Sequence, residues 1–488
     1  MNLITNFSLT NVNKAIFSVL ILIITFTSLF GQSPDTLWTR TFGGTNWDEG
    51  KSVQVLASKD IIISGFSHSF GDWWQFYLIK TDSSGNLIWQ KTYGGAYDDC
   101  CYSQEQTSDS GFIMTGWTSS FGSGLRDVYL VKTNAYGDTL WTRTYGGTER
   151  DIAFSVKEAR DKGYIIAGQT NSFGAGNSDI FIVKTDSSGT LEWMKTYGGA
   201  SNDYGYSVQE TTDSAFIVCG FTESFSAGKG DIYIIKTNIN GDSVWTKAFG
   251  DTADERAYSV QQTSDGGFII TGYTESYGAG NSDIVLIKTN EAGNITWQRS
   301  YGGTNYDCGY SVCQTQDSGY IVAGDTKSFG SGESDVYIIR TDANGDTLWT
   351  ATFGGAGTDK AYAVTQTQDA DYVVTGATAS YGAGSYDVYL LKVKFHTGLC
   401  ETNYAENLRS FSNLNISPNP FHNTAVLHFK HYPITFPTPQ VKIYDQSGRL
   451  LINKAVASNP IVLGSNLKPG IYFLTINNFK NKKLVKFR

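Results

Sequence analysis

The chain has 488 residues, a formal net charge of −9, 17% charged residues, 14% aromatic residues and 53 glycines. A chain of this length exceeds one ordinary globular domain unless that domain is built from repeats. The few charges, many aromatic residues and many glycines are typical of short strands joined by tight turns, and they exclude a mainly helical protein.

The first 31 residues predict an export signal. Lys14 precedes an apolar run from Ala15 to Phe30, and the small residue Gly31 follows it. The run is short and rich in Ser and Thr, so an N-terminal membrane anchor is the weaker alternative. No cysteine precedes Cys100, which excludes a lipid-modified N-terminal cysteine. No later segment is apolar enough to cross a bilayer, so we expect no transmembrane segment in the mature chain.

Tryptophans at a nearly constant spacing define a repeat. The steps between them are 51 residues once and then 52 residues five times, for Trp38, Trp89, Trp141, Trp193, Trp245, Trp297 and Trp349. A period of about 50 residues is typical of propellers and solenoids, in which one unit cannot bury its apolar surface alone. We expect these indoles in the core or between blades, where each contributes about 2 to 3 kcal/mol by burial.

Each unit contains four strand-like segments separated by turn-rich loops. In the unit from Asp307 to Gly355 they are GYSVCQT, GYIVAGDT, DVYIIRT and DTLWTATF. The second and third are apolar at consecutive positions, so both faces must be covered, as in stacked blades. The last unit stops near Phe395 without a fourth strand, and a strand of that type stands at 35–42. We predict that this strand completes the last blade and leaves no open sheet edge.

The sequence therefore predicts an all-β protein. A seven-bladed β-propeller of four-stranded blades is expected over 35–395, followed by a linker at 396–412 and a small β-sandwich at 413–488. All eight prolines lie at Pro34 or at Pro418 and beyond, which agrees with continuous paired strands between them. The units, such as SVQQTSDGGFIITGYTESYGAGNSDIVLIKTNEAGNITWQRSYGG, resemble those of secreted or cell-surface seven-bladed propellers. That resemblance implies a fold and no particular chemistry.

The cysteines form no recognisable framework. The six residues Cys100, Cys101, Cys219, Cys308, Cys313 and Cys400 are few for a disulfide scaffold and lack the CxxC pairs of a zinc site. We expect mostly buried thiols.

The C-terminal residues differ in charge from the rest of the chain. Residues 401–488 hold 11 Lys and Arg and three Asp and Glu, a net charge of +8 that leaves −17 for the first 400 residues. The opposite net charges of these two regions indicate that they have different functions. A nucleic-acid partner is disfavoured, because the basic residues are not arranged with aromatic stacking platforms.

The segments ISPNPF (416–421), VKIYDQSGRLL (441–451) and LKPGIYFLTI (467–476) stand in this order at the extreme C-terminus. They resemble the C-terminal sorting domain of the Bacteroidetes type IX secretion system. The matching residues are Pro418, Asn419, Pro420, Tyr444, Asp445, Gly448, Arg449, Gly470 and Tyr472. The resemblance implies Sec export, passage across the outer membrane by the type IX machinery, removal of the tail, and secretion or attachment at the cell surface. A generic binding sandwich is the alternative.

Two columns of acidic residues recur with the repeat, at the start of the first strand and before the third strand. The first column is Asp48, Asp99, Asp151, Asp203, Glu255, Asp307 and Asp359. The second is Asp127, Asp179, Asp231, Asp283, Asp335 and Asp387, with Gln75 in the first unit. In an antiparallel blade both positions lie at the same end. The columns could bind Ca²⁺ or supply carboxylate pairs for glycoside cleavage. Sevenfold repetition favours a structural role, in which each carboxylate accepts loop N–H groups.

Histidine limits the chemistry that the propeller could perform. The repeat region contains a single histidine, His68, so a histidine-rich metal centre is excluded. Catalysis would depend on carboxylates or tyrosines. We predict no catalytic residue and no cofactor apart from the calcium considered above.

Departures from the repeat are the best candidates for function. Four tryptophans stand outside the periodic set, all in the first two units and at the end of the acidic columns: Trp47, Trp73, Trp74 and Trp117. With Asp48, Arg126 and Arg150 they would suit stacking on sugar rings or contact with a partner protein. The alternative is that Trp73 and Trp74 fill the space left by a one-residue shortening of the first unit.

These features predict a secreted, non-enzymatic propeller that binds an extracellular glycan or protein through one face. A carboxylate-dependent hydrolase or lyase acting on glycans is the alternative. A purely structural surface-layer protein is the third hypothesis.

Overall fold

The computed structural model describes residues 35–394 in full. It also describes the backbone of 415–417, 425–428, 440–444, 450–455, 461–463, 470–476 and 479–486. The chain divides into two compact units, Met1–Gly398 and Leu399–Arg488. The predicted export signal, the linker and Cys400 lie outside the described residues.

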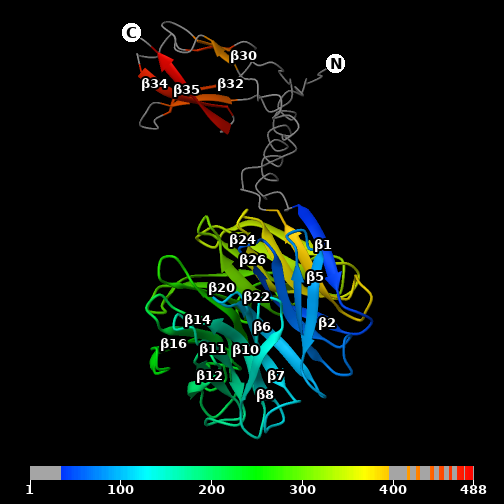
Figure 1. Ribbon diagram of the computed structural model, residues 1–488. Coiled ribbons are helices and arrows are strands. Elements are labelled where there is room, and N and C mark those ends of the chain that lie inside the picture. The colour runs from blue at the N-terminus through cyan, green and yellow to red at the C-terminus, as the bar shows by residue number, and fades with distance from the viewer. Residues whose placement is uncertain are drawn as a thin grey trace, which may run out of the picture. The chain divides into compact units, whose positions relative to one another are not determined.

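The first unit is a seven-bladed β-propeller, which confirms the predicted fold (Figure 1). Each blade is an antiparallel sheet of four strands. The innermost strands contact one another in a closed circle. They are β2 (Asp48–Val55), β6 (Asp99–Gln106), β10 (Asp151–Glu158), β14 (Asp203–Glu210), β18 (Glu255–Gln262), β22 (Asp307–Gln314) and β26 (Asp359–Gln366).

The second and third strands of each blade are buried on both faces, as their continuous apolar sequences predict. The second strands are β3 (Ile61–Ser67), β7 (Phe112–Thr118), β11 (Tyr164–Thr170), β15 (Phe216–Thr222), β19 (Phe268–Thr274), β23 (Tyr320–Thr326) and β27 (Tyr372–Thr378). The third strands are β4 (Gln75–Thr81), β8 (Asp127–Thr133), β12 (Asp179–Thr185), β16 (Asp231–Thr237), β20 (Asp283–Thr289), β24 (Asp335–Thr341) and β28 (Asp387–Val393).

The outermost strands carry the periodic tryptophans. They are β5 (Leu87–Tyr93), β9 (Thr139–Tyr145), β13 (Leu191–Tyr197), β17 (Ser243–Phe249), β21 (Ile295–Tyr301), β25 (Thr347–Phe353) and β1 (Thr36–Phe42). We number the blades 1 to 7 from β2–β5 onward, so that blade 7 contains β26, β27, β28 and β1.

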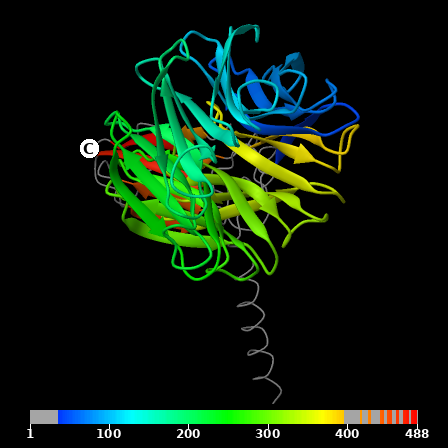
Figure 2. The ribbon, with the colours of Figure 1, turned by 90° about the horizontal axis from the view of Figure 1, so that it is seen from below.

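The N-terminal strand closes the ring as predicted. β1 pairs antiparallel with β28, with Thr41 opposite Tyr389 and Phe42 opposite Val388. The blue first blade and the yellow last blade lie side by side in Figures 1 and 2. Every blade of the described propeller therefore has four strands, and β28 has no open edge.

The hydrophobic core lies between consecutive blades. One cluster, for example, joins Ile113 and Leu130 of blade 2 to Val156 and Phe181 of blade 3. The periodic tryptophans border these clusters. Trp89 lies 6.2 Å from Phe112 of the next blade, measured between ring centroids, and Trp349 is 4% exposed. The indoles therefore contact the neighbouring blade, as expected.

A turn glycine of the next blade fits beneath each of six tryptophans. Gly137, at a φ of +77°, is one example, because a Cβ there would lie 3.0 Å from the ring of Trp89. Both its positive φ and the close approach of the indole require glycine.

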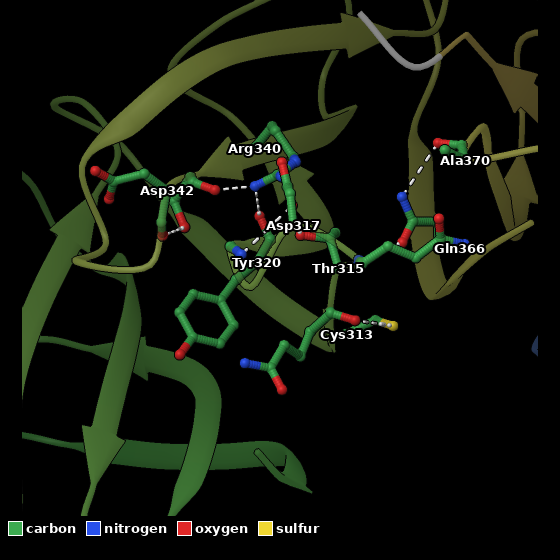
Figure 3. Close-up of polar contacts among 12 residues, drawn as sticks. Cys313, Thr315, Asp317, Tyr320, Arg340, Asp342, Gln366 and Ala370 are labelled. Carbon is green, nitrogen blue, oxygen red and sulfur yellow. Dashed lines mark hydrogen bonds and ion pairs between the residues drawn. The ribbon is translucent and has the colours of Figure 1, made fainter. Parts of the chain in front are cut away.

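Ion pairs at the opposite end of the blades from the acidic columns also join strands. Arg340 is 1% exposed and pairs with Asp317, and its Nε donates to the Tyr372 hydroxyl of the next blade at 2.9 Å. Figure 3 shows Arg340 pointing at Asp317, with Tyr320 beside them. The position equivalent to Arg340 is lysine in other blades, such as Lys132, which pairs with Asp109 at 2.8 Å.

Of the five cysteines in the described propeller, Cys100, Cys101, Cys219 and Cys308 are buried free thiols and Cys313 is half-buried and free. Burial raises the pKa of Cys101 to about 12, so this thiol is inert at neutral pH. No described residue belongs to a helix with the length and apolar character needed to span a membrane.

The described strands of the second unit form two antiparallel sheets. The first has the order β29 (Asn415–Ser417), β30 (Ala425–His428) and β33 (Ile461–Leu463). The second has the order β32 (Leu450–Ala455), β31 (Gln440–Tyr444), β34 (Gly470–Ile476) and β35 (Phe479–Lys486).

Candidate functional site

Adjacent blades meet at seven equivalent junctions, all at the end where each innermost strand begins. At each one, the first residue of the innermost strand donates its N–H to the carbonyl oxygen of the residue that precedes the third strand of the previous blade. The side chains beside this bond belong to two residues. From the junction of blades 7 and 1 onward the pairs are Tyr386/Trp47, Trp74/Asp98, Arg126/Arg150, Ser178/Asn202, Gly230/Asp254, Ser282/Tyr306 and Ser334/Thr358.

The acidic columns are buried at these junctions. Asp307, which is 0% exposed, accepts the Gly303 N–H at 2.8 Å and the Ser328 hydroxyl at 2.6 Å through Oδ2. Asp283 of the second column accepts the N–H of Ala279 at 2.8 Å. A Cβ at Gly302 would collide with both carboxylates. The carboxylates therefore bind the backbone of the loops. Because they fill the space beside Gly302, only glycine fits at this position before the first strand.

Burial and like charge oppose ionisation of four carboxylates of the second column. Desolvation by burial, with a smaller contribution from the neighbouring first-column carboxylate, raises the pKa of Asp127, Asp231, Asp283 and Asp387. Residues 35–394 contain no group of three or more His, Cys, Asp or Glu side chains placed to hold a metal ion. Calcium binding stays a prediction from the sequence.

Two of the non-periodic tryptophans, Trp47 at the junction of blades 7 and 1 and Trp74 at the junction of blades 1 and 2, meet over blade 1. Trp47 is 39% exposed and stacks on Tyr386 with 4.6 Å between ring centroids. Its centroid lies 5.5 Å from that of Trp74, which is half-buried and packs against Phe66 at 4.7 Å. His68 lies 5.9 Å from Trp74. Trp47, Trp74 and Tyr386 form a partly exposed aromatic surface, which we call the aromatic patch.

The other two differ in exposure. Trp73 is 46% exposed and lies 6.2 Å from Tyr97. Trp117 is only 5% exposed, and the Arg126 guanidinium covers its ring at 3.8 Å. Two of the seven predicted contact residues, Trp117 and Asp48, therefore do not reach the surface. Trp117 lies in β7 beneath Arg126, and Asp48 is 0% exposed and bound to the Gly44 N–H at 2.8 Å.

Arg126 and Arg150 face each other at the junction of blades 2 and 3, where they form an isolated parallel β-bridge. Arg126 is half-buried and Arg150 is exposed. These two candidate residues therefore lie side by side.

A polar group below Trp47 was not predicted. The Trp47 indole Nε1–H donates to Glu49 Oε1 at 2.6 Å, and Glu49 pairs with Lys51. The Lys51 ammonium lies 3.3 Å from the ring centroid of Tyr362 in blade 7. Desolvation by burial lowers the pKa of Lys51, against the opposing effect of Glu49.

Sequence reasoning also missed a belt of aromatic residues around the propeller axis. The fourth residue of each innermost strand contributes to it, with consecutive ring centroids 4.9 to 5.3 Å apart: Tyr102, Phe154, Tyr206, Tyr258, Tyr310 and Tyr362. Lys51 occupies the seventh position. All seven side chains are half-buried. The signal was present in the sequence as a column of Tyr and Phe interrupted once by Lys51.

Comparison with known proteins identifies the C-terminal region. Residues 415–487 match the family described as the secretion system C-terminal sorting domain. The regulatory protein FlaEY of Caulobacter vibrioides is 27% identical over 194 residues, which make up 36% of this chain. The chain spans about a fifth of that relative's length, since the match covers 20% of it.

Solved structures resemble the propeller weakly. Sqt1 from Chaetomium thermophilum has a TM-score of 0.42 and 10% identity, with 70% of this chain and 82% of that chain covered. A subtype N11 neuraminidase-like protein (A/flat-faced bat/Peru) has a TM-score of 0.33 and 12% identity, with coverages of 60% and 87%. These scores assign no function. The prediction for the tail is confirmed, and the chain joins a seven-bladed propeller to a C-terminal sorting domain that directs it to the type IX secretion machinery.

Proposed function

We propose that this protein is a non-enzymatic binding protein, secreted or held at the outer-membrane surface, that recognises an extracellular glycan through the junction end of its propeller. An extracellular protein is the alternative partner. Export is supported by the sorting domain at 415–487, and the single most important observation for binding is where the repeats differ from one another.

The buried residues at the junctions hardly vary, whereas the residues beside them vary in size, charge and polarity. Blade 1 begins with Trp47 immediately before β2, and Glu49 and Lys51 follow at alternate positions within that strand. The same end also holds Tyr386 and Trp74. Fold stability requires none of this variety, because the repeated carboxylates and glycines already hold the loops. Variation in size, charge and polarity among solvent-facing positions around a constant scaffold is the expected result of selection for a ligand.

The aromatic patch suits a sugar ring better than a charged peptide. Trp47 and Tyr386 present stacked rings at partial exposure, and the indole N–H of Trp47 is already held by Glu49 at 2.6 Å. An indole fixed in this way loses little conformational entropy on contact with a ligand. Flat, rigid aromatic surfaces bind apolar C–H faces of pyranose rings with little desolvation cost.

The glycosidase alternative is less well supported by the same geometry. The column carboxylates are buried and occupied by backbone N–H groups, as for Asp307 with Gly303 at 2.8 Å. A general acid and its partner must reach the substrate oxygen. Glu49 is 5% exposed and engaged with Trp47 and Lys51.

The test is binding of the full chain to an array of extracellular polysaccharides and purified oligosaccharides. We expect binding that Trp47→Ala combined with Tyr386→Ala, the two stacked rings of the aromatic patch, reduces at least tenfold. Tyr136→Ala, at an aromatic residue that is 74% exposed in the turn after β8, is the matched control and should bind normally. Equal binding by all three proteins would contradict the proposal. Release of shortened oligosaccharide by the wild type, abolished by Glu49→Gln, would support the enzyme instead.

A further inference from the structure

One junction differs electrostatically from the other six. At the junction of blades 2 and 3 both facing residues are basic, Arg126 and Arg150, and their backbones pair in a parallel bridge. At the remaining junctions of the described propeller neither facing residue is basic. Two adjacent like charges repel each other, and they are favoured only where solvent or an anion compensates them.

Three other cations at this end of the propeller have acidic partners. Lys51 pairs with Glu49, the Arg256 Nε lies 3.3 Å from Asp254, and the Lys360 Nζ lies 3.7 Å from Asp325. Among residues 35–394 neither Arg126 nor Arg150 forms an ion pair. Asp98, at the adjacent junction, instead accepts the Trp74 N–H at 3.3 Å. The two guanidinium groups therefore keep their hydrogen-bonding capacity for a group from outside the chain.

Arg126 is also held in place. Its guanidinium lies 3.8 Å from the ring centroid of the buried Trp117, and this cation–π contact restricts the positions that the side chain can take. Trp117 belongs to a buried cluster with Phe66, Cys100 and Ile152, and Trp74 of the aromatic patch packs against that cluster. The basic pair and the aromatic patch are thus adjoining parts of one surface, supported by one cluster.

We propose that Arg126 and Arg150 bind the anionic substituent of an acidic glycan whose sugar ring lies on the aromatic patch. This inference rests on the proposed function and specifies its ligand class. The anionic group is the carboxylate of a uronic acid or a sulfate ester, because both present oxygen acceptors that match a guanidinium fork. The first 400 residues carry a net charge of −17, so a polyanion would be repelled elsewhere and directed to this junction.

The experiment measures affinity of the full chain for three oligosaccharides of equal length: an oligogalacturonate, a sulfated oligosaccharide and a neutral one. The variants are Arg126→Gln/Arg150→Gln and Lys229→Gln/Lys327→Gln. The second pair removes the same charge from exposed loop positions of other blades and serves as the control. Far-ultraviolet circular dichroism and the melting temperature verify that each variant is folded.

We expect at least one acidic ligand to bind more tightly than the neutral one, with an affinity that falls as NaCl is raised. The arginine variant should lose about tenfold for each guanidinium removed, while the lysine variant stays within about twofold. The preferred acidic ligand then identifies carboxylate or sulfate. If the neutral oligosaccharide binds as well and the arginine variant keeps full affinity, this inference fails and the proposed function stands. If none of the oligosaccharides binds, the glycan proposal itself fails.

Discussion

The junction of blades 2 and 3 and the junction of blades 5 and 6 are alike where they are buried and different where they face solvent. In both, a first-column carboxylate accepts a loop N–H at 2.8 Å, from Gly147 to Asp151 and from Gly303 to Asp307. Beside these bonds stand two arginines in one case, and Ser282 with Tyr306 in the other. The buried carboxylates and the loop N–H groups that they bind maintain the fold. The facing residues beside them are therefore free to vary with the ligand.

The comparison predicts that the repeated elements dominate stability, most of all where the ring closes. Deleting residues 35–42 removes β1 and exposes the edge of β28. We expect loss of the cooperative melting transition and aggregation, because an unpaired strand is a template for association. Size-exclusion chromatography and calorimetry measure both effects. The control, Trp38→Ala, keeps the strand and should cost only about 2 kcal/mol; a deleted chain that melts like the wild type would contradict the closure argument.

Adjacent residues at one junction provide the sharpest test. Asp151→Ala leaves the Gly147 N–H and the Ser172 hydroxyl, now bonded at 2.8 and 2.7 Å, without an acceptor. We expect the free energy of unfolding to fall by about 2 to 4 kcal/mol in urea titrations. Arg150→Ala, one residue earlier and exposed, should change it by less than about 0.5 kcal/mol. Similar losses for both would remove the distinction between buried and variable positions.

The pH dependence of stability should differ between the two ends of the propeller. Partial burial by itself would raise the pKa of Asp109, but hydrogen bonds from the Lys132 ammonium, the Thr107 hydroxyl and the Gly111 N–H hold it at about 2. Its folded pKa lies below the unfolded value, so its contribution is full above about pH 4 and is lost as pH falls toward 2. At the junction end the pKa of Asp127 is raised, so its contribution has the opposite sign and is lost as pH rises.

Melting temperatures from pH 5 to pH 2 test this difference. We expect the wild type to lose stability as pH falls, and Asp109→Asn to start lower and show a flatter decline. Asp127→Asn should instead show a steeper decline, since it removes a group that gains a proton more readily when folded. Parallel curves for the three proteins would argue against these assignments.

The fold could be predicted because every repeat has the same order of four strand-like segments. The fourth strand that the last repeat lacks is found at 35–42. The exposure of Trp47 and Trp73 could be predicted because these residues break that pattern. The burial of Trp117 could not, since it depends on Arg126, which immediately precedes β8 and covers the ring. The aromatic belt was missed because a repeated tyrosine looks structural until the innermost strands are seen to surround one axis.

Ring closure also sets when the propeller can be complete. Thr36 pairs with Val393, so β1 and β28, which are neighbours in the last blade, come from opposite ends of the propeller sequence. The entropic cost of such a closure grows only with the logarithm of the intervening length, but contacts of this sequence separation form late. A chain still being synthesised or exported cannot finish blade 7 until its final strand is available. Pairing of β1 with β28 therefore occurs only after all seven blades of the propeller are available.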